Sequence, residues 1–120
     1  AMVLAGRGWH AGVIGIVAGR LAEKYSRPCV LIALDELGQP VGTGSARTAA
    51  GLNLHKALSS CSEHLVTFGG HAAAAGLRID EAQIDDFRNH FFRHVAEQIS
   101  EQDRIAEVHI DAEASLPQKT

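Results

Sequence analysis

The sequence has few cysteines and no long apolar run, and both absences limit what the protein can be. Of its 120 residues two are cysteines, Cys29 and Cys61, which lie too far apart in the chain to form a recognisable disulfide or metal-binding motif. We expect two buried free thiols, as is usual in a reducing compartment. No stretch approaches the ~18 consecutive apolar residues of a membrane span. We therefore expect a cytoplasmic protein without a membrane partner.

The sequence also lacks an excess of positive charge. The sequence has eleven Lys and Arg residues and fourteen Asp and Glu residues, and the resulting net charge of −3 argues against a generic nucleic-acid-binding surface. The charges are uneven, because residues 1–60 hold six basic and three acidic side chains (+3), whereas residues 61–120 hold five and eleven (−6). An anionic ligand would favour the first half.

A chain of 120 residues with 46% hydrophobic composition fits one globular domain. Apolar residues at helical spacing, among them Ile14 and Leu21, predict a helix over 11–25, and Pro28 prevents its continuation. The continuous apolar run 29–34 predicts a central buried strand. Because the turn 35–40 is too short for a helical crossover, strand 41–47 should run antiparallel to it.

The rest of the chain continues this alternation of helices and strands. Asn53 can cap a helix that continues to about Cys61. We further expect strands at 2–5, 65–68 and 77–79, one helical turn at 72–75 that Gly76 ends, a long helix from the cap Asp80 to about Ser100, and an acidic, half-buried strand at 105–114. The predicted fold class is α/β: a single domain with a mixed β-sheet of about five strands flanked by helices.

Three segments are candidates for binding a phosphate-bearing ligand. The first is Phe68-Gly69-Gly70-His71, where a strand ends, two glycines follow and the expected helical turn begins. Glycines let a backbone approach a ligand, and the free N–H groups of a helix start favour an anion. His71 adds a donor that can be neutral or charged near pH 7. The alternative is a plain tight turn with a packed or capping histidine.

The second segment runs from Gly42 to Thr48. Its alternating glycines leave one face of a strand without side chains, which suits another backbone or a ligand. Ser45 and Thr48 offer hydroxyls, and Arg47 offers a planar guanidinium suited to phosphate. The alternative is a bent edge strand that ends in a solvated arginine.

The third segment, Gly6-Arg7-Gly8-Trp9-His10-Ala11, fits the G-x-G-x-x-G/A pattern of dinucleotide-binding proteins. The acidic residue that should follow it, Asp35, comes 29 residues after Gly6, when about 20 is usual. A hairpin rather than a βαβ crossover comes next. We therefore interpret Trp9 and His10 as residues at a helix entrance, one packing and one capping.

No complete catalytic centre is visible in the sequence. A two-metal phosphoesterase needs several Asp and His side chains in one cleft, but here the carboxylates crowd residues 80–113, where a solvated face is expected. The seven histidines are scattered. His90 and His94 have i, i+4 spacing, yet no Glu follows His90 as in a zinc protease, so we predict a surface pair.

Three segments of the chain resemble the DHH-associated domain of RecJ-like exonucleases, which belong to the DHH phosphoesterase superfamily. Residues 9–18, with Arg20-Leu21 and Arg27-Pro28, look like the opening of that domain. Residues 44–48 resemble its S-G-R-S segment, and residues 68–77 closely resemble its G-G-H-x-x-A-A-G motif. Their order and spacing also fit, and the similarity runs from about Val3 to Val95. Ala46 stands where the family usually has glycine, which leaves Arg47 in place.

The resemblance implies that the whole protein degrades single-stranded DNA from its 5′ end, in recombination and repair. It implies Mn²⁺ or Mg²⁺ held by a DHH domain of the same polypeptide, and no catalytic or metal-binding residue in this chain. The DHH-associated domain would grip the DNA across a cleft from that metal centre and would be inactive alone. The residues that would contact phosphate or line the cleft are Ser45, Arg47, Thr48, Gly69, Gly70 and His71.

We accordingly interpret residues 1–115 as a nucleic-acid-binding DHH-associated domain, residues 116–120 as a linker, and the chain as a piece of a longer protein that carries the DHH domain. Three alternatives stay open. The same domain occurs in enzymes that cleave short oligonucleotides or cyclic dinucleotides, and beside alanyl-tRNA synthetases. The chain could also be a nucleic-acid-binding module without an enzyme, or a dinucleotide-dependent oxidoreductase.

Overall fold

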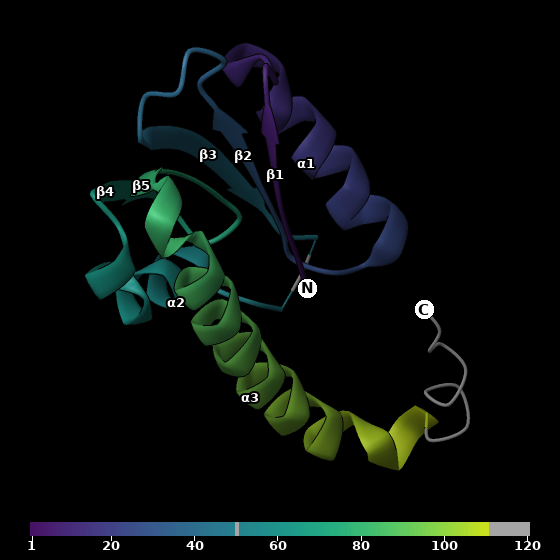
Figure 1. Cartoon of the computed structure of the whole chain (residues 1–120). Helices are drawn as coiled ribbons and strands as arrows, with labels where there is room; N and C mark the ends of the chain where they lie inside the picture. The colour runs from purple at the N-terminus through teal and green to yellow at the C-terminus, as the bar shows by residue number, and fades with distance from the viewer. Residues whose placement is uncertain (50, 111–120) are drawn as a thin grey trace.

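Five strands form one mixed sheet in the computed structural model, which describes residues 1–49 and 51–110 (Figure 1). The strands are β1 (Met2–Arg7), β2 (Cys29–Leu34), β3 (Val41–Arg47), β4 (Thr67–Gly70) and β5 (Ala74–Asp80). Their order in the sheet is β1-β2-β3-β5-β4. β1 and β2 are parallel, and the other neighbours are antiparallel, as predicted for β2 and β3. The predicted α/β class and the five-stranded mixed sheet are confirmed.

Helix α1 (Ala11–Tyr25) connects the two parallel strands and lies on one face of the sheet, over β2 and β3 (Figure 1). His10 caps its start, because Nδ1 accepts a hydrogen bond from the Gly12 N–H at 3.1 Å. Ser26 ends it in the left-handed conformation. The helix buries Ile14 and Ala18 against a small apolar cluster that includes Leu31. The prediction of a capping histidine is confirmed.

The opposite face of the sheet carries the main core, under α2 (Leu54–Ser60) and α3 (Ile84–Ile110) (Figure 1). A short 3₁₀ helix, η1 (Ser62–His64), follows α2, and a second, η2 (Glu81–Gln83), precedes α3. Asn53 caps α2, as predicted. Asp80 caps η2, whereas the sequence predicted that it would cap the long helix, which begins at Ile84. The largest buried side chains of this core include Phe87, Phe91, Leu54, Leu58, Ile32 and Ile79.

The strand predicted at 105–114 is wrong where the structure describes it. Residues 105–110 are the last turns of α3, and residues 111–114 lie outside the described part of the chain. No glycine or proline interrupts the sequence from Ile84 to Ile110, so nothing stops the helix at Ser100. The apolar alternation that suggested a strand is weaker than this continuous run of helix-forming residues.

The helical turn predicted at 72–75 is also wrong, because β4 and β5 form a hairpin there. The His71 N–H donates to the Ala74 carbonyl at 2.9 Å across the turn. Ala74 and Ala75 then pair with Arg47 and Ala46 of β3. Alanine favours a helix in isolation, and pairing with a neighbouring strand overrides that preference.

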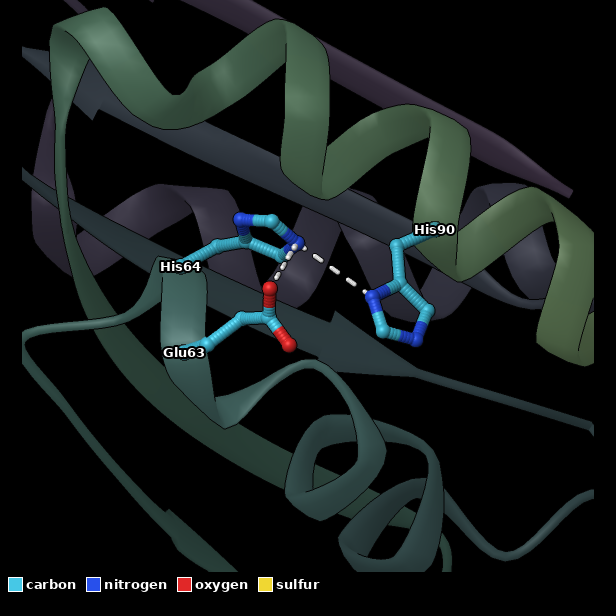
Figure 2. Close-up of side chains that lie close together, drawn as sticks. All are labelled: Glu63, His64 and His90. Atoms are coloured by element: carbon cyan, nitrogen blue, oxygen red, sulfur yellow. Dashed lines mark hydrogen bonds and ion pairs between the residues drawn. The ribbon is translucent and has the colours of Figure 1, made fainter.

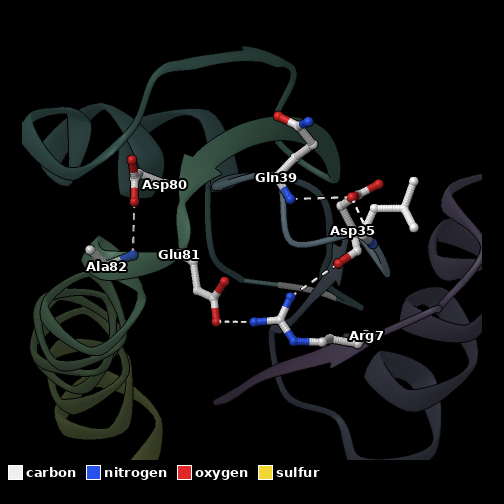
Figure 3. A network of polar contacts seen from close by, with 7 residues as sticks. Arg7, Asp35, Gln39, Asp80, Glu81 and Ala82 are labelled. Atoms are coloured by element: carbon white, nitrogen blue, oxygen red, sulfur yellow. Dashed lines mark hydrogen bonds and ion pairs between the residues drawn. The ribbon is translucent and has the colours of Figure 1, made fainter.

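A polar network around Arg7 ties the end of β1 to the turn after β2 and to η2 (Figure 3). The Arg7 guanidinium donates to the Asp35 carbonyl at 3.0 Å and forms an ion pair with Glu81. The Asp35 carboxylate accepts from the Leu37 and Gln39 N–H groups at 2.9 and 3.2 Å. Asp35 therefore closes a turn, which is a structural role.

Both cysteines are free and buried, as predicted. Burial raises the pKa of the Cys29 thiol and of the Cys61 thiol, which keeps both protonated near neutral pH. Among the described residues, none of the helices is both long and apolar enough to cross a membrane.

The hairpin gives its two glycines different requirements. Gly70 has φ +138°, and a Cβ there would lie 2.5 Å from the Ala75 Cα, whereas a Cβ on Gly69 would meet nothing within 4 Å. We expect Gly70→Ala to lower the free energy of unfolding by about 1–3 kcal/mol. Gly69→Ala, the matched control, should change it by less than about 0.5 kcal/mol. Urea denaturation measures both, and equal effects would contradict this hairpin geometry.

Candidate phosphate-binding site

Helix α1 leaves part of its side of the sheet uncovered. It packs on β2 and β3, while the side chains of β5 and β4 that point the same way are exposed. We call this surface the open face. It consists of Thr43, Ser45 and Arg47 from β3, Gly76 and Arg78 from β5, and Thr67 and Gly69 from β4. The alternate residues of the same strands, among them Leu77 and Ile79, point into the main core.

The sheet register brings Ser45 of one predicted segment close to Gly69 of another on the open face. The alternating glycines Gly42 and Gly44 lie on the other face, where a Cβ on Gly44 would be 2.9 Å from the Leu77 side chain, so the prediction that they leave a face bare for a ligand is wrong. Ser45 pairs with Gly76, and Gly76 pairs with Gly69 on its other side. The row Ser45-Gly76-Gly69 therefore crosses three strands with one small side chain. Such a row leaves the backbone accessible to a ligand.

Arg47 lies between the sheet and α1 in a fixed orientation. Its Nη1 donates to the Ala46 carbonyl at 2.8 Å and to the Ala75 carbonyl at 3.4 Å, and the residue is partly buried. A Cβ on Gly15 would lie 2.7 Å from the Arg47 Nη2, so this glycine in α1 provides the space for the guanidinium. A guanidinium held in this way loses little freedom when it binds an anion.

Ser45 points to the same place as Arg47. A Cβ on Gly15 would lie 3.4 Å from the Ser45 Oγ, and the same Cβ would lie 2.7 Å from the Arg47 Nη2. The hydroxyl and the guanidinium therefore converge beside one glycine of α1. Convergent donors of these two types suit phosphate oxygens.

Thr48 connects this pair to the β4–β5 hairpin. Its N–H donates to the Ala73 carbonyl at 3.2 Å, which ties the end of β3 to the turn that carries His71. Its Oγ1 is buried and has no hydrogen-bond partner within the described structure. Buried polar groups are nearly always hydrogen-bonded, so an unpartnered hydroxyl beside Arg47 is a candidate for ligand contact.

The first predicted segment divides into residues with different roles. His71 is exposed in the hairpin turn, and Gly69 is exposed on the open face. Gly70 is required by the hairpin itself, as its close approach to Ala75 shows. Because no helix starts here, a helix N-terminus contributes nothing to anion binding, and that part of the sequence argument is wrong.

Sequence reasoning missed Arg78 as a site residue. It lies on the open face, next to the row formed by Ser45, Gly76 and Gly69, and pairs with Thr43 on one side and Thr67 on the other. Within the described residues its exposed guanidinium makes no ion pair. The alternation of Arg78 with the core residues Leu77 and Ile79 was the available signal.

The third predicted segment does not bind a dinucleotide in the usual way. A Cβ on Gly6 would lie 2.1 Å from the Trp9 Cε2, so Gly6 provides space for the indole ring. An open groove of about 550 Å³ lies beside His10, but Asp35 and Glu36 line it. The Asp35 carboxylate accepts hydrogen bonds from its own turn, so it does not take the ribose-binding role that the pattern assigns to it. The packing and capping interpretation holds.

The chain is similar to DHHA1 domains and to RecJ proteins. The family model described as "DHHA1 domain" matches residues 1–97. A "Single-stranded-DNA-specific exonuclease RecJ" of Bacillus subtilis (strain 168) is 36% identical over 111 residues, which cover 92% of this chain and 14% of that protein. The RecJ of Dickeya dadantii (strain 3937) is 40% identical over 116 residues, 93% of this chain and 20% of that protein.

Solved structures agree with these sequence matches. The crystal structure of RecJ from Thermus thermophilus in complex with Mg²⁺ matches with a TM-score of 0.71 at 35% identity, over 80% of this chain and 14% of that one. Its complex with Mn²⁺ matches equally. The chain thus spans no more than about a fifth of the length of these relatives.

The space at Gly15 can be tested against a second glycine of α1. A Cβ on Gly19 would lie 3.9 Å from the Arg47 Cγ, an ordinary contact. We expect Gly19→Ala to raise the free energy of unfolding by up to about 1 kcal/mol, the usual gain of alanine in a helix. Gly15→Ala should not raise the free energy of unfolding, because the new Cβ displaces the Arg47 guanidinium from its two carbonyl partners.

Urea denaturation of both variants, with and without Arg47→Ala, measures this difference. In the Arg47→Ala background the stabilisation by Gly15→Ala should return. Equal stabilisation by both alanines in the unaltered background would contradict the packing of Arg47 against Gly15.

Proposed function

The chain belongs to the DHHA1 domain family, and from that premise we propose that its open face holds the phosphates of single-stranded DNA for a RecJ-like exonuclease. Residues Ser45, Arg47 and Thr48 contact phosphate oxygens. Gly69 and His71 line the same surface on the neighbouring hairpin, and Gly70 shapes that hairpin. The convergence of the Ser45 hydroxyl and the Arg47 guanidinium beside Gly15 is the observation that carries the proposal.

Charge supports an anionic ligand at the open face. Arg47 and Arg78 both lie there, while the chain as a whole has a net charge of −3. Of the strand residues that share this side, Asp80 has a carboxylate, and it accepts from the Ala82 N–H at 2.9 Å (Figure 3). Local arginines on an acidic protein direct phosphate to this surface and away from the acidic helix α3.

The chemistry of the proposed reaction is assigned to a different part of the longer protein. The donors on the open face include the guanidinium groups of Arg47 and Arg78, whose positive charge and N–H groups suit an anion and not a metal cation. In the proposed exonuclease the metal ions, held by a DHH domain, activate water for phosphodiester hydrolysis. This chain's residues hold the strand in position and offset the phosphate charge, which lowers the barrier through orientation and electrostatics.

An apolar surface supports a place within a longer polypeptide. A groove of about 410 Å³ runs between β1 and α1, and its lining includes Leu4, Trp9, Val13 and Val17, all exposed. We assign this groove to contact with another segment of the same longer polypeptide. The matched region makes up only 14% and 20% of the length of the two related RecJ proteins, so most of each relative lies outside it. The action in recombination and repair, and digestion from the 5′ end, belong to the same proposal.

Salt-dependent binding tests the open face directly. We expect the 120-residue chain to bind a fluorescently labelled single-stranded oligonucleotide with a 5′ phosphate, measured by anisotropy at several low salt concentrations. Arg47→Ala should weaken binding about tenfold or more, because a charge-assisted hydrogen bond to phosphate is lost. The slope of log K against log salt should fall by about 0.7 for each phosphate contact removed. Arg78→Ala should lower the slope in the same way.

Arg93→Ala is the matched control. It removes the same charge from an exposed position on α3, on the opposite side of the sheet. It should leave both the affinity and the salt slope within about twofold of the parent chain. Binding that is absent at low salt, or that Arg93→Ala weakens as much as Arg47→Ala, would contradict the assignment of phosphate to the open face.

A further inference from the structure

Three side chains with metal-binding atoms meet on the side of the sheet opposite the open face (Figure 2). Glu63 and His64 come from η1, and His90 comes from α3. One donor atom from each lies within 4.8 Å of the other two. The sequence predicted His90 as half of a surface pair with His94, but His90 is partly buried and contacts His64 instead.

The distance between the two imidazoles fits a shared metal ion. His64 Nε2 and His90 Nδ1 are 3.2 Å apart, with the rings nearly perpendicular at 81°. Two nitrogens bound to one tetrahedral Zn²⁺, each at the usual 2.0–2.1 Å, are about 3.3 Å apart. The same His64 Nε2 is 3.8 Å from the Glu63 Oε2, so a carboxylate oxygen approaches the point that both histidines face.

Gln83 orients the His64 ring for this role. The His64 Nδ1 lies 3.4 Å from the Gln83 Oε1, which can only accept a hydrogen bond. When the His64 Nδ1–H donates to this oxygen, Nε2 is the nitrogen left to bind a metal ion, and it lies toward His90 and Glu63. A ligating histidine usually donates its other N–H to such an oxygen.

The surroundings leave the site open to solvent on one side. The His64 side chain is 13% exposed, whereas the Glu63 side chain is 73% exposed. A metal ion can therefore enter without unfolding the protein, and water can complete a four-coordinate shell. Two imidazoles and one carboxylate with an open position match the ligand set of an open zinc site.

We propose that Glu63, His64 and His90 form a zinc-binding site that fastens η1 to α3. The nitrogen donors select Zn²⁺ over Mg²⁺, which prefers oxygen ligands in an octahedral arrangement. The site lies away from the open face and does not depend on the function proposed for that face. It holds the segment between α2 and β4 against the C-terminal helix.

Calorimetric titration of Zn²⁺ into the metal-free 120-residue chain tests the site. We expect one equivalent to bind with a Kd in the micromolar range or below. His90→Gln, which keeps a polar side chain of similar length, should weaken binding at least tenfold. Glu63→Gln should weaken it less, and its exposed position keeps the fold intact. Millimolar Mg²⁺ should not displace the bound Zn²⁺.

His55→Gln is the matched control, since His55 is an exposed histidine of α2 outside the cluster. It should bind Zn²⁺ as the parent chain does. Zn²⁺ in excess should also raise the Tm of the parent and of His55→Gln by roughly 4 °C or more, and leave that of His90→Gln unchanged. No binding to the parent, or equal binding by His90→Gln and the parent, would overturn the proposal.

Discussion

The position of Arg47 between α1 and the sheet is the constraint on which the proposed site depends. Two backbone carbonyls hold its guanidinium, and the absence of a side chain on Gly15 gives it room. Without that glycine, α1 could not lie over β3 and leave the arginine in the same place. The glycines of α1 lower its helix propensity, and the space that Gly15 opens is where Ser45 and Arg47 converge.

The two faces of the sheet carry different kinds of side chain. The face under α2 and α3 contains the large apolar side chains, such as Phe87 and Phe91. The open face has small and cationic side chains and little apolar packing. Strand alternation produces this separation, because neighbouring residues of β3 and β5 point to opposite sides. Substitutions on the open face should therefore leave the packing of the main core largely unchanged.

The sequence predicted the elements whose signals are local, and the structure corrected those that depend on distant partners. Helix α1 and strands β2 and β3 have the predicted bounds, since periodicity, Pro28 and the short turn 35–40 are read within a few residues. The segment 72–75 is part of a hairpin, and not a helical turn, because Ala74 and Ala75 pair with β3. The Ser45-Gly76-Gly69 row and the contact of His64 with His90 arise from register and packing, which no local pattern specifies.

Chemical-shift mapping shows which face of the sheet binds a single-stranded oligonucleotide. Spectra of the ¹⁵N-labelled chain are compared without and with a 5′-phosphorylated single-stranded oligonucleotide, and with its 5′-hydroxyl counterpart. We expect the largest amide shifts at 45–48, at His71 and at 76–78, and little change in α2 and α3. Shifts concentrated on α2 and α3, or in the groove lined by Asp35 and Glu36, would contradict the assignment of phosphate to the open face.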